Sequence, residues 1–202
     1  MSTALTDDDR RALREKYRAE RDKRLRADAN AQYGEPVGRF ANLLEDPYTP
    51  FVEREPVDDE VTVLVIGAGF AGLVTGARLK QAGIDDIRIV DKAGDVGGVW
   101  YWNRYPGAMC DTAAMIYLPL LEETGTVPSA KYVPAPEIHA HAVRIAETFG
   151  LYDDALFSTG IESVDWDAAS HRWIVRTDRG DTIRAKYVTM GTGPLHLSLI
   201  HI

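Results

Sequence analysis

The sequence is poor in cysteine, since Cys110 is the only one among 202 residues. No internal disulfide is possible, so we expect a reducing compartment, the cytoplasm. Long apolar runs are missing too: nothing approaches the ~18 residues of a membrane span, and no apolar segment near Met1 suggests a secretory signal. The 23 basic residues are outnumbered by 31 acidic residues, and the resulting net charge of −8 disfavours general binding to nucleic acid or acidic membranes.

What is present is a βαβ pattern over residues 61–91. Residues 61–66 are β-branched at every position but Leu64, which is typical of a parallel strand buried on both faces. The glycine pattern G-x-G-x-x-G follows directly, and apolar residues at helical spacing lead to Gly83, a plausible helix end. A second short strand, residues 87–90, ends at Asp91. The sequence therefore predicts strand, glycine turn, helix, strand and acid.

Each part of this unit has a role in binding a nucleotide. Gly67 permits a tight turn, Gly69 lets the backbone approach a pyrophosphate, and Gly72 lets the helix pack near the strand. The amino end of the helix then faces the phosphates. Asp91 is placed to accept hydrogen bonds from ribose hydroxyls and would repel a 2′-phosphate, which favours FAD or NAD over NADP at this site. The alternative is a purely structural turn without a ligand.

The segment after the second strand is unusually aromatic for a surface loop. Residues 94–107 read GDVGGVWYWNRYPG, with two of the four tryptophans within three residues. The glycines allow another close backbone approach, and the aromatic side chains could form the wall of a pocket for a planar ring. A hydrophobic plug beneath a long loop explains the residues equally well.

These residues resemble a known family. GAGFAGL at 67–73, the D-x-x-G-D-V-G-G-V-W-Y-W-N-R-Y-P-G string that starts at Asp91, and the following Cys110 and Asp111 are similar to class B flavoprotein monooxygenases, and among them to Baeyer–Villiger monooxygenases. The resemblance continues through residues 117–125, 136–138 and 190–194, and so covers nearly the whole chain. It departs from the family pattern at Ala113 and Ala114, where a Glu-Ser pair is usual.

The resemblance implies two cofactors, FAD and NADPH, and a set of site residues. Asp111 corresponds to a carboxylate that pairs with an arginine of the NADPH domain, which stabilises the oxygenated flavin; we assign Asp111 a catalytic role. Met109, Cys110 and Asp111 match a segment that touches the nicotinamide cofactor, and Ile161 matches a backbone edge against adenine. The full cofactor-binding set comprises Gly67, Gly69, Ala71, Gly72, Asp91, Lys92, Gly98, Val99, Trp100, Tyr101, Trp102, Met109, Cys110, Asp111, Tyr117 and Ile161. No metal ligands are expected.

The rest of the chain completes an α/β fold. We expect a Rossmann-like FAD/NAD(P)-binding domain over residues 59–196, with a parallel sheet and an inserted β-meander, after an N-terminal helical and irregular extension over 1–58. The extension contains a charged helix from residue 7 to about 29, which we expect to lie on the domain. Three strands are expected over 157–166, 172–177 and 182–188, with 187–190 as the last central strand. An amphipathic helix over 136–150 leaves His139 and His141 at the surface.

The expected activity belongs to a longer protein. The family's NADPH domain is not in the sequence, so we expect an incomplete flavin domain, and residues 197–202 do not resemble the family and are expected to be non-native. The implied reaction inserts one oxygen atom from O₂ beside a ketone carbonyl to give an ester or lactone, with no nucleic acid or membrane partner. Two alternatives stay open: an N- or S-oxygenating relative, and a non-catalytic flavin-binding fragment. The sequence indicates neither the ketone nor the oligomeric state.

Overall fold

The structure is a computed structural model that describes residues 6–27 and 37–193. The predicted non-native tail and the resemblance at Pro194 lie outside these residues. The chain divides into two compact units, residues 1–45 and 46–202. Residues 46–57, which the sequence analysis assigns to the extension, are in the second compact unit. The predicted boundary at residue 58 between the extension and the FAD-binding domain stays a prediction.

The first unit contains the charged helix, α1, Asp7–Asp22. Thr6 and Asp9 form a capping box, in which the Thr6 hydroxyl accepts from the Asp9 N–H (3.2 Å) and the Asp9 carboxylate accepts from the Thr6 N–H (2.9 Å). No side chain of the helix is buried. The predicted helix is therefore confirmed, with an earlier end, and its packing on the domain stays a prediction. A 3₁₀ helix, η2, spans Gly38–Leu44.

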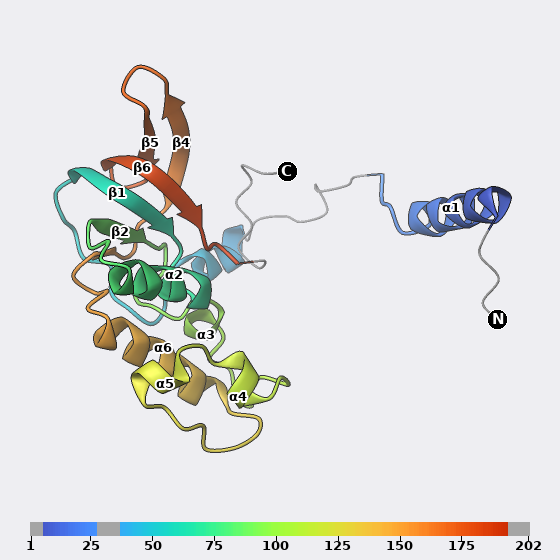
Figure 1. The fold of residues 1–202 in the computed structure, drawn as a ribbon, viewed down its shortest axis with the longest axis horizontal. Coiled ribbons are helices and arrows are strands. Elements are labelled where there is room, and N and C mark those ends of the chain that lie inside the picture. The colour runs from blue at the N-terminus through green and yellow to red at the C-terminus, as the bar shows by residue number, and fades with distance from the viewer. Residues whose placement is uncertain (1–5, 28–36, 194–202) are drawn as a thin grey trace. The chain divides into compact units, whose positions relative to one another are not determined.

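The second unit is built on one six-stranded sheet (Figure 1), in the order β3-β2-β1-β6-β5-β4. Strands β3, β2, β1 and β6 are parallel, and β6, β5 and β4 form an antiparallel meander. The strands are β1 Asp58–Ile66, β2 Ile87–Val90, β3 Ala155–Leu156, β4 Ile161–Asp167, β5 Arg172–Thr177 and β6 Thr182–Met190. The parallel sheet and the meander are confirmed.

Two details of the predicted sheet are wrong. The last meander strand and the last central strand are one continuous strand, because β6 pairs along its whole length with β1 while its first half also pairs with β5. The first meander strand begins at Ile161 and not at residue 157, since Ser158 has a positive φ of 49° that interrupts extended backbone. Residues 155–156 instead form β3 at the edge of the parallel sheet, which the sequence did not indicate.

Two helices lie on one side of the parallel strands and pack against each other (Figure 1). They are α2, Phe70–Gln81, and α6, Ala135–Thr148. Val63, Val65 and Ile89 pack there against buried side chains of both helices. Leu64 and Ile66 face the other way, into a second buried cluster shared with the meander. This two-sided burial explains the unbroken apolar run at residues 63–66 of β1.

The aromatic stretch and its continuation form three short helices: α3 Val99–Trp102, α4 Ala114–Tyr117 and α5 Leu121–Thr124. The surface interpretation of the α6 histidines is wrong. His141 is 3% exposed, because it contacts the Pro119 carbonyl between α4 and α5, and His139 is half-buried, because it contacts the Val96 carbonyl of the glycine loop. Within the described residues, no helix is long and apolar enough to cross a membrane.

Candidate cofactor-binding site

The first glycine turn joins the carboxyl end of β1 to α2. Gly67 has a φ of 103°, and a Cβ built on it would lie 2.5 Å from the Gly191 carbonyl oxygen. A Cβ on Gly72 would lie 1.8 Å from the Gly67 oxygen, so helix and strand approach too closely for any other residue. Gly69 is the N-cap of α2 and offers no side-chain cap, which leaves the first N–H groups of the helix for an anion.

Asp91 lies directly beside this turn. Its Oδ2 accepts from the Ala68 N–H (2.5 Å) and its Oδ1 accepts from the Ala93 N–H (2.8 Å). The Thr159 N–H donates to the Asp91 carbonyl (2.9 Å), which places the segment leading to Ile161 alongside. These contacts hold the Asp91 carboxylate next to the glycine turn.

A second glycine turn closes against the first. The Gly97 N–H donates to the Ala68 carbonyl (2.9 Å). Gly98 has a φ of 56° and a ψ of −120°, and a Cβ on it would lie 2.8 Å from the Gly69 Cα. A side chain at Gly98 would therefore force the two loops apart. Backbone from residues 29 positions apart meets here, where the resemblance predicts a pyrophosphate.

The aromatic residues divide into two groups. The Trp100 Nε1–H donates to the Tyr117 hydroxyl (2.8 Å), and Phe70 packs edge-on against Tyr117 with ring centroids 5.7 Å apart. Burial raises the pKa of Tyr117. Tyr101, in contrast, is 0% exposed and its hydroxyl donates to Asp46 (2.5 Å). Its side chain is buried against residues 46–49, so its predicted cofactor contact would have to be made by backbone.

Residues 109–111 follow the aromatic loop in the chain. Met109 is 56% exposed, Asp111 is exposed, and Cys110 is buried in a cluster with α4 and α6 residues. Ala114, one of the two departures from the family pattern, is in the same apolar cluster.

The structure thus brings some predicted residues together and not others. Gly67, Gly69, Gly72, Asp91 and Gly98 meet at the carboxyl ends of β1 and β2. Ala71, Lys92 and Val99 are exposed around them, and Trp102 is half-buried. Ile161 begins β4, and Trp100 with Tyr117 forms a separate aromatic pair. The cofactor-binding role of each of these residues stays a prediction.

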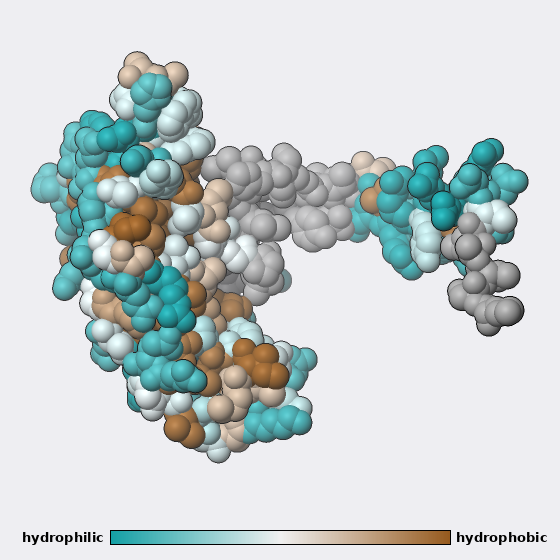
Figure 2. Space-filling model, viewed as in Figure 1, coloured by the Kyte–Doolittle hydropathy of each residue, from teal (hydrophilic) through white to brown (hydrophobic). Residues whose placement is uncertain are grey.

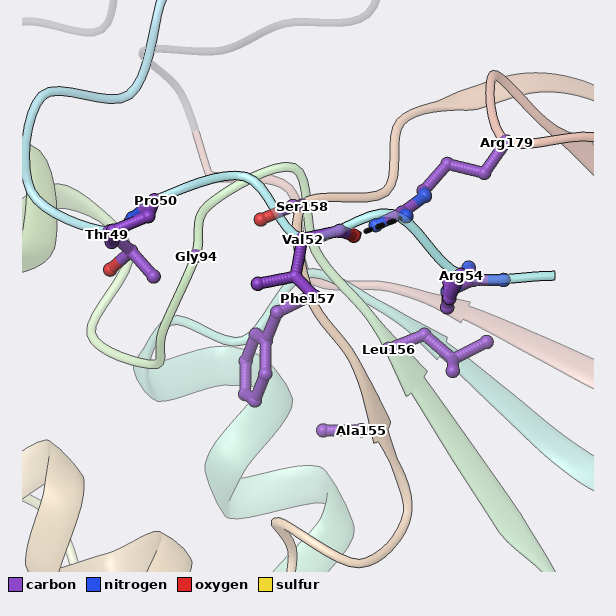
Figure 3. A pocket seen from close by; sticks show the side chains of 10 residues that line it. All are labelled: Thr49, Pro50, Val52, Arg54, Gly94, Ala155, Leu156, Phe157, Ser158 and Arg179. Carbon is purple, nitrogen blue, oxygen red and sulfur yellow. Dashed lines mark hydrogen bonds between the residues drawn. The ribbon is translucent and has the colours of Figure 1, made fainter. Parts of the chain in front are cut away.

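A pocket of about 260 Å³ lies beside the second glycine turn (Figure 3). The pocket is lined by residues 155–158, by Gly94 and Arg179, and by Thr49, Pro50, Val52 and Arg54. Arg179 donates to the Val52 carbonyl (2.6 Å). None of the predicted cofactor residues lines this pocket, so it is separate from the candidate site.

The sequence reasoning missed the contribution of residues 46–49. Asp46 accepts hydrogen bonds from Tyr101 and from the Gly94 N–H (2.9 Å), and Thr49 packs on Gly94, whose Cβ position lies 2.3 Å from the Thr49 Cβ. The local sequence Asp-Pro-Tyr-Thr is a turn signal. No local signal reveals that this turn contacts a loop more than 40 residues later.

Comparisons with known proteins agree with this geometry. A family model described as an NAD(P)-binding Rossmann-like domain matches residues 65–126. Over 186 residues the chain is 54% identical to neopentalenolactone D synthase of Streptomyces avermitilis, and over 192 residues it is 52% identical to a Baeyer–Villiger monooxygenase of Streptomyces coelicolor. The predicted resemblance to Baeyer–Villiger monooxygenases is confirmed.

A solved structure extends the likeness from sequence to fold. The polycyclic ketone monooxygenase of Thermothelomyces thermophila superposes with a TM-score of 0.77 at 38% identity, over 91% of this chain and 32% of that one. The two Streptomyces relatives are matched over 92% and 95% of this chain, but over only 31% and 32% of their own lengths. The chain therefore spans about a third of the Baeyer–Villiger monooxygenases that it matches.

Proposed function

We propose that this chain forms the FAD-binding part of a longer, NADPH-dependent Baeyer–Villiger monooxygenase. Such an enzyme would use O₂ to convert a ketone into an ester or lactone. The observation that carries the proposal is the meeting of two glycine turns beside Asp91, in a chain about half identical to proteins of that family. Since the chain spans about a third of these relatives, the reaction belongs to the longer protein.

The site fits FAD in three respects. The cradle formed by Gly67, Gly69 and Gly98 has no side chains, so a pyrophosphate could contact its backbone. The uncapped amino end of α2 supplies N–H donors to the phosphates. Asp91 would accept from the ribose hydroxyls and exclude a 2′-phosphate, which directs NADPH to a separate site.

Bound FAD would supply the redox-active ring that accepts hydride from NADPH and activates O₂. This chain's residues would bind and orient it. The resemblance implies that Trp100 and Tyr117 lie near the flavin, with their mutual hydrogen bond fixing both rings. Asp111, which is exposed here, would hold an arginine from another part of the enzyme close to the reacting atoms. The lone, buried Cys110 fits a cytoplasmic enzyme.

A titration with FAD tests the binding proposal, and a pair of glycine variants sharpens it. Gly69 has a φ of −76°, and its Cβ would lie 3.4 Å from the Gly98 Cα, so Gly69→Ala should fold normally but block the pyrophosphate. Gly72→Ala should instead disrupt the fold, since its Cβ would overlap the Gly67 carbonyl. Equal FAD affinity of folded Gly69→Ala and the parent would contradict the assigned cradle.

Product analysis tests the reaction. The longer protein is incubated with FAD, NADPH and matched ketones, amines and sulfides, and the products are identified. Ester or lactone formation is expected. Oxygenation of amines or sulfides without ester formation would favour the alternative of an N- or S-oxygenating relative.

A further inference from the structure

Residues 46–49 form a turn that holds the second glycine loop. The Asp46 carboxylate accepts four hydrogen bonds: Oδ1 from the Tyr48 and Thr49 N–H groups (2.9 and 3.3 Å), and Oδ2 from the Gly94 N–H and the Tyr101 hydroxyl (2.9 and 2.5 Å). Two donors come from its own turn and two from the loop. Asp46 therefore joins two segments about 50 residues apart.

Tyr101 is the anchor of that loop. Its ring is 0% exposed and packs edge-on against Tyr48, with centroids 5.7 Å apart, while His139 of α6 lies on another side at 6.0 Å. Its hydroxyl also contacts the Thr49 hydroxyl (2.7 Å). Arg104 stacks over both tyrosine rings, at 4.1 Å from Tyr48 and 4.6 Å from Tyr101. Apart from Arg104, the residues that set the position of Tyr101 lie outside its own loop.

The backbone of Tyr101 in turn fixes Gly98. The Tyr101 N–H donates to the Gly98 carbonyl (3.0 Å), and the Trp102 N–H does so at 3.2 Å. Gly98 is the residue that meets Gly69 of the first glycine turn. A continuous series of contacts therefore connects Asp46, through Tyr101 and Gly98, to the cradle.

We propose that Asp46 is a positioning residue of the cofactor site. It holds Tyr101 so that Gly98 stays against Gly69 in the geometry that the FAD pyrophosphate requires, and it does not touch the cofactor itself. This inference rests on the proposed function, because it assumes that the cradle binds FAD.

The chemistry of the contact calls for a carboxylate. All four partners are donors, and two carboxylate oxygens accept from all of them, whereas an asparagine would direct its own N–H groups at two of these donors. Burial alone would raise the pKa of Asp46, but the hydrogen bonds from Tyr101 and three backbone N–H groups outweigh it and lower that pKa. Burial, the larger cause, and the hydrogen bond to Asp46, the next, raise the pKa of Tyr101 to about 12. The Tyr101 hydroxyl therefore stays protonated and can donate to Asp46.

A double-mutant cycle on FAD affinity tests the proposal. Asp46→Ala, Tyr101→Phe and the double variant are titrated with FAD, and flavin release is followed by stopped flow. Each single variant should weaken FAD about tenfold, as for the loss of one hydrogen bond to a charged group, and speed its release. The double variant should also lose about tenfold, not a hundredfold, because both changes break one linkage. Glu45→Ala, an exposed neighbouring carboxylate, should stay within about twofold of the parent.

The outcomes separate the two proposals. A parent protein that binds no FAD overturns the proposed function and this inference with it. A parent that binds FAD, together with a folded Asp46→Ala variant of equal affinity, overturns only the inference. Independent losses that multiply in the double variant also overturn it, since Asp46 would then not act through Tyr101. If Asp46→Ala fails to fold, Tyr101→Phe decides, because it keeps the packed ring: unchanged affinity overturns the inference.

Discussion

Replacing Asp181 by asparagine should lower the free energy of unfolding by about 3 kcal/mol at pH 7. The Asp181 side chain is 0% exposed and forms a two-point ion pair with Arg54, at 2.5 and 2.6 Å. It also accepts from the Thr177 hydroxyl (2.6 Å) and the Val57 N–H (2.7 Å). These contacts attach residues 54–57 to the turn between β5 and β6.

The magnitude follows from this geometry. Removing one partner of a buried ion pair typically costs about 3–5 kcal/mol, because the remaining charge is left without compensation. The Arg54 side chain stays 23% exposed, so water can partly solvate it in the variant. The expected loss therefore lies at the lower end of that range.

The effect should depend on pH in a defined direction. Burial by itself would raise the pKa of Asp181, but the hydrogen bonds from Arg54, Thr177 and Val57 lower it from 3.8 to about 2. Because the folded-state pKa lies below the unfolded one, the ionised carboxylate stabilises the fold above pH ~4, and this stabilisation is lost as the pH falls through about 2. The shift corresponds to about 2–3 kcal/mol.

Urea unfolding of the parent and Asp181→Asn at several pH values measures both quantities. The difference between the two proteins should be largest at pH 7 and shrink between pH 4 and 2. Asp165→Asn is the matched control: Asp165 pairs with Arg176 at 3.3 Å with both side chains more than half exposed, so its loss should stay below about 0.5 kcal/mol. A loss for Asp181→Asn as small as that of the control, or one independent of pH, would refute the reasoning.

Three further predictions concern other parts of the molecule. Burial lowers the pKa of His141, so protonation of His141 opposes folding. The urea midpoint of the parent should therefore fall as the pH drops below about 6.5, and that of His141→Gln should fall less. Parallel pH profiles of the two proteins would contradict this. In the proposed longer enzyme, Asp111→Ala should retain FAD but lose ~10²–10³ in the rate of ester formation, and a loss of only a few fold would argue against its role. Ile116 of α4 is 81% exposed beside Met115, which is 68% exposed. Figure 2 shows hydrophobic side chains exposed on the surface of this unit, so Ile116→Lys should reduce self-association in sedimentation velocity, and equal association would be the refuting result.

Much of the nucleotide-binding half could be read from local sequence. The run at 61–66, the glycine pattern and the acid at Asp91 are each a short-range signal, and the structure assembles them as strand, turn, helix and strand. The ends of α2 and β2 also follow local rules, as Gly83 with its φ of 78° shows. These elements agree because local preference and tertiary packing favour the same conformation.

The rest depended on contacts between distant segments. β3 has two residues and exists only because β2 offers an unpaired edge. His141 is buried because its ring nitrogens find Thr126 (3.1 Å) and the Pro119 carbonyl (2.6 Å), which helical periodicity does not reveal. The position of Tyr101 depends in the same way on Asp46. Hydrophobic pattern reports which face is apolar, but not which polar side chains find buried partners.

The continuity of β6 has a consequence for engineering this domain. The strand leaves the meander at Thr182 and ends at Met190, and the next residue, Gly191, contacts both Gly67 and Gly72 of the nucleotide turn. The meander is therefore not a removable module, although it looks like an insertion in the chain. Excising β4 and β5 would strip β6 of its antiparallel neighbour and expose a strand edge that invites pairing with another chain. Chimaeras between related domains should keep the whole segment from Ile161 to Gly191 from a single parent.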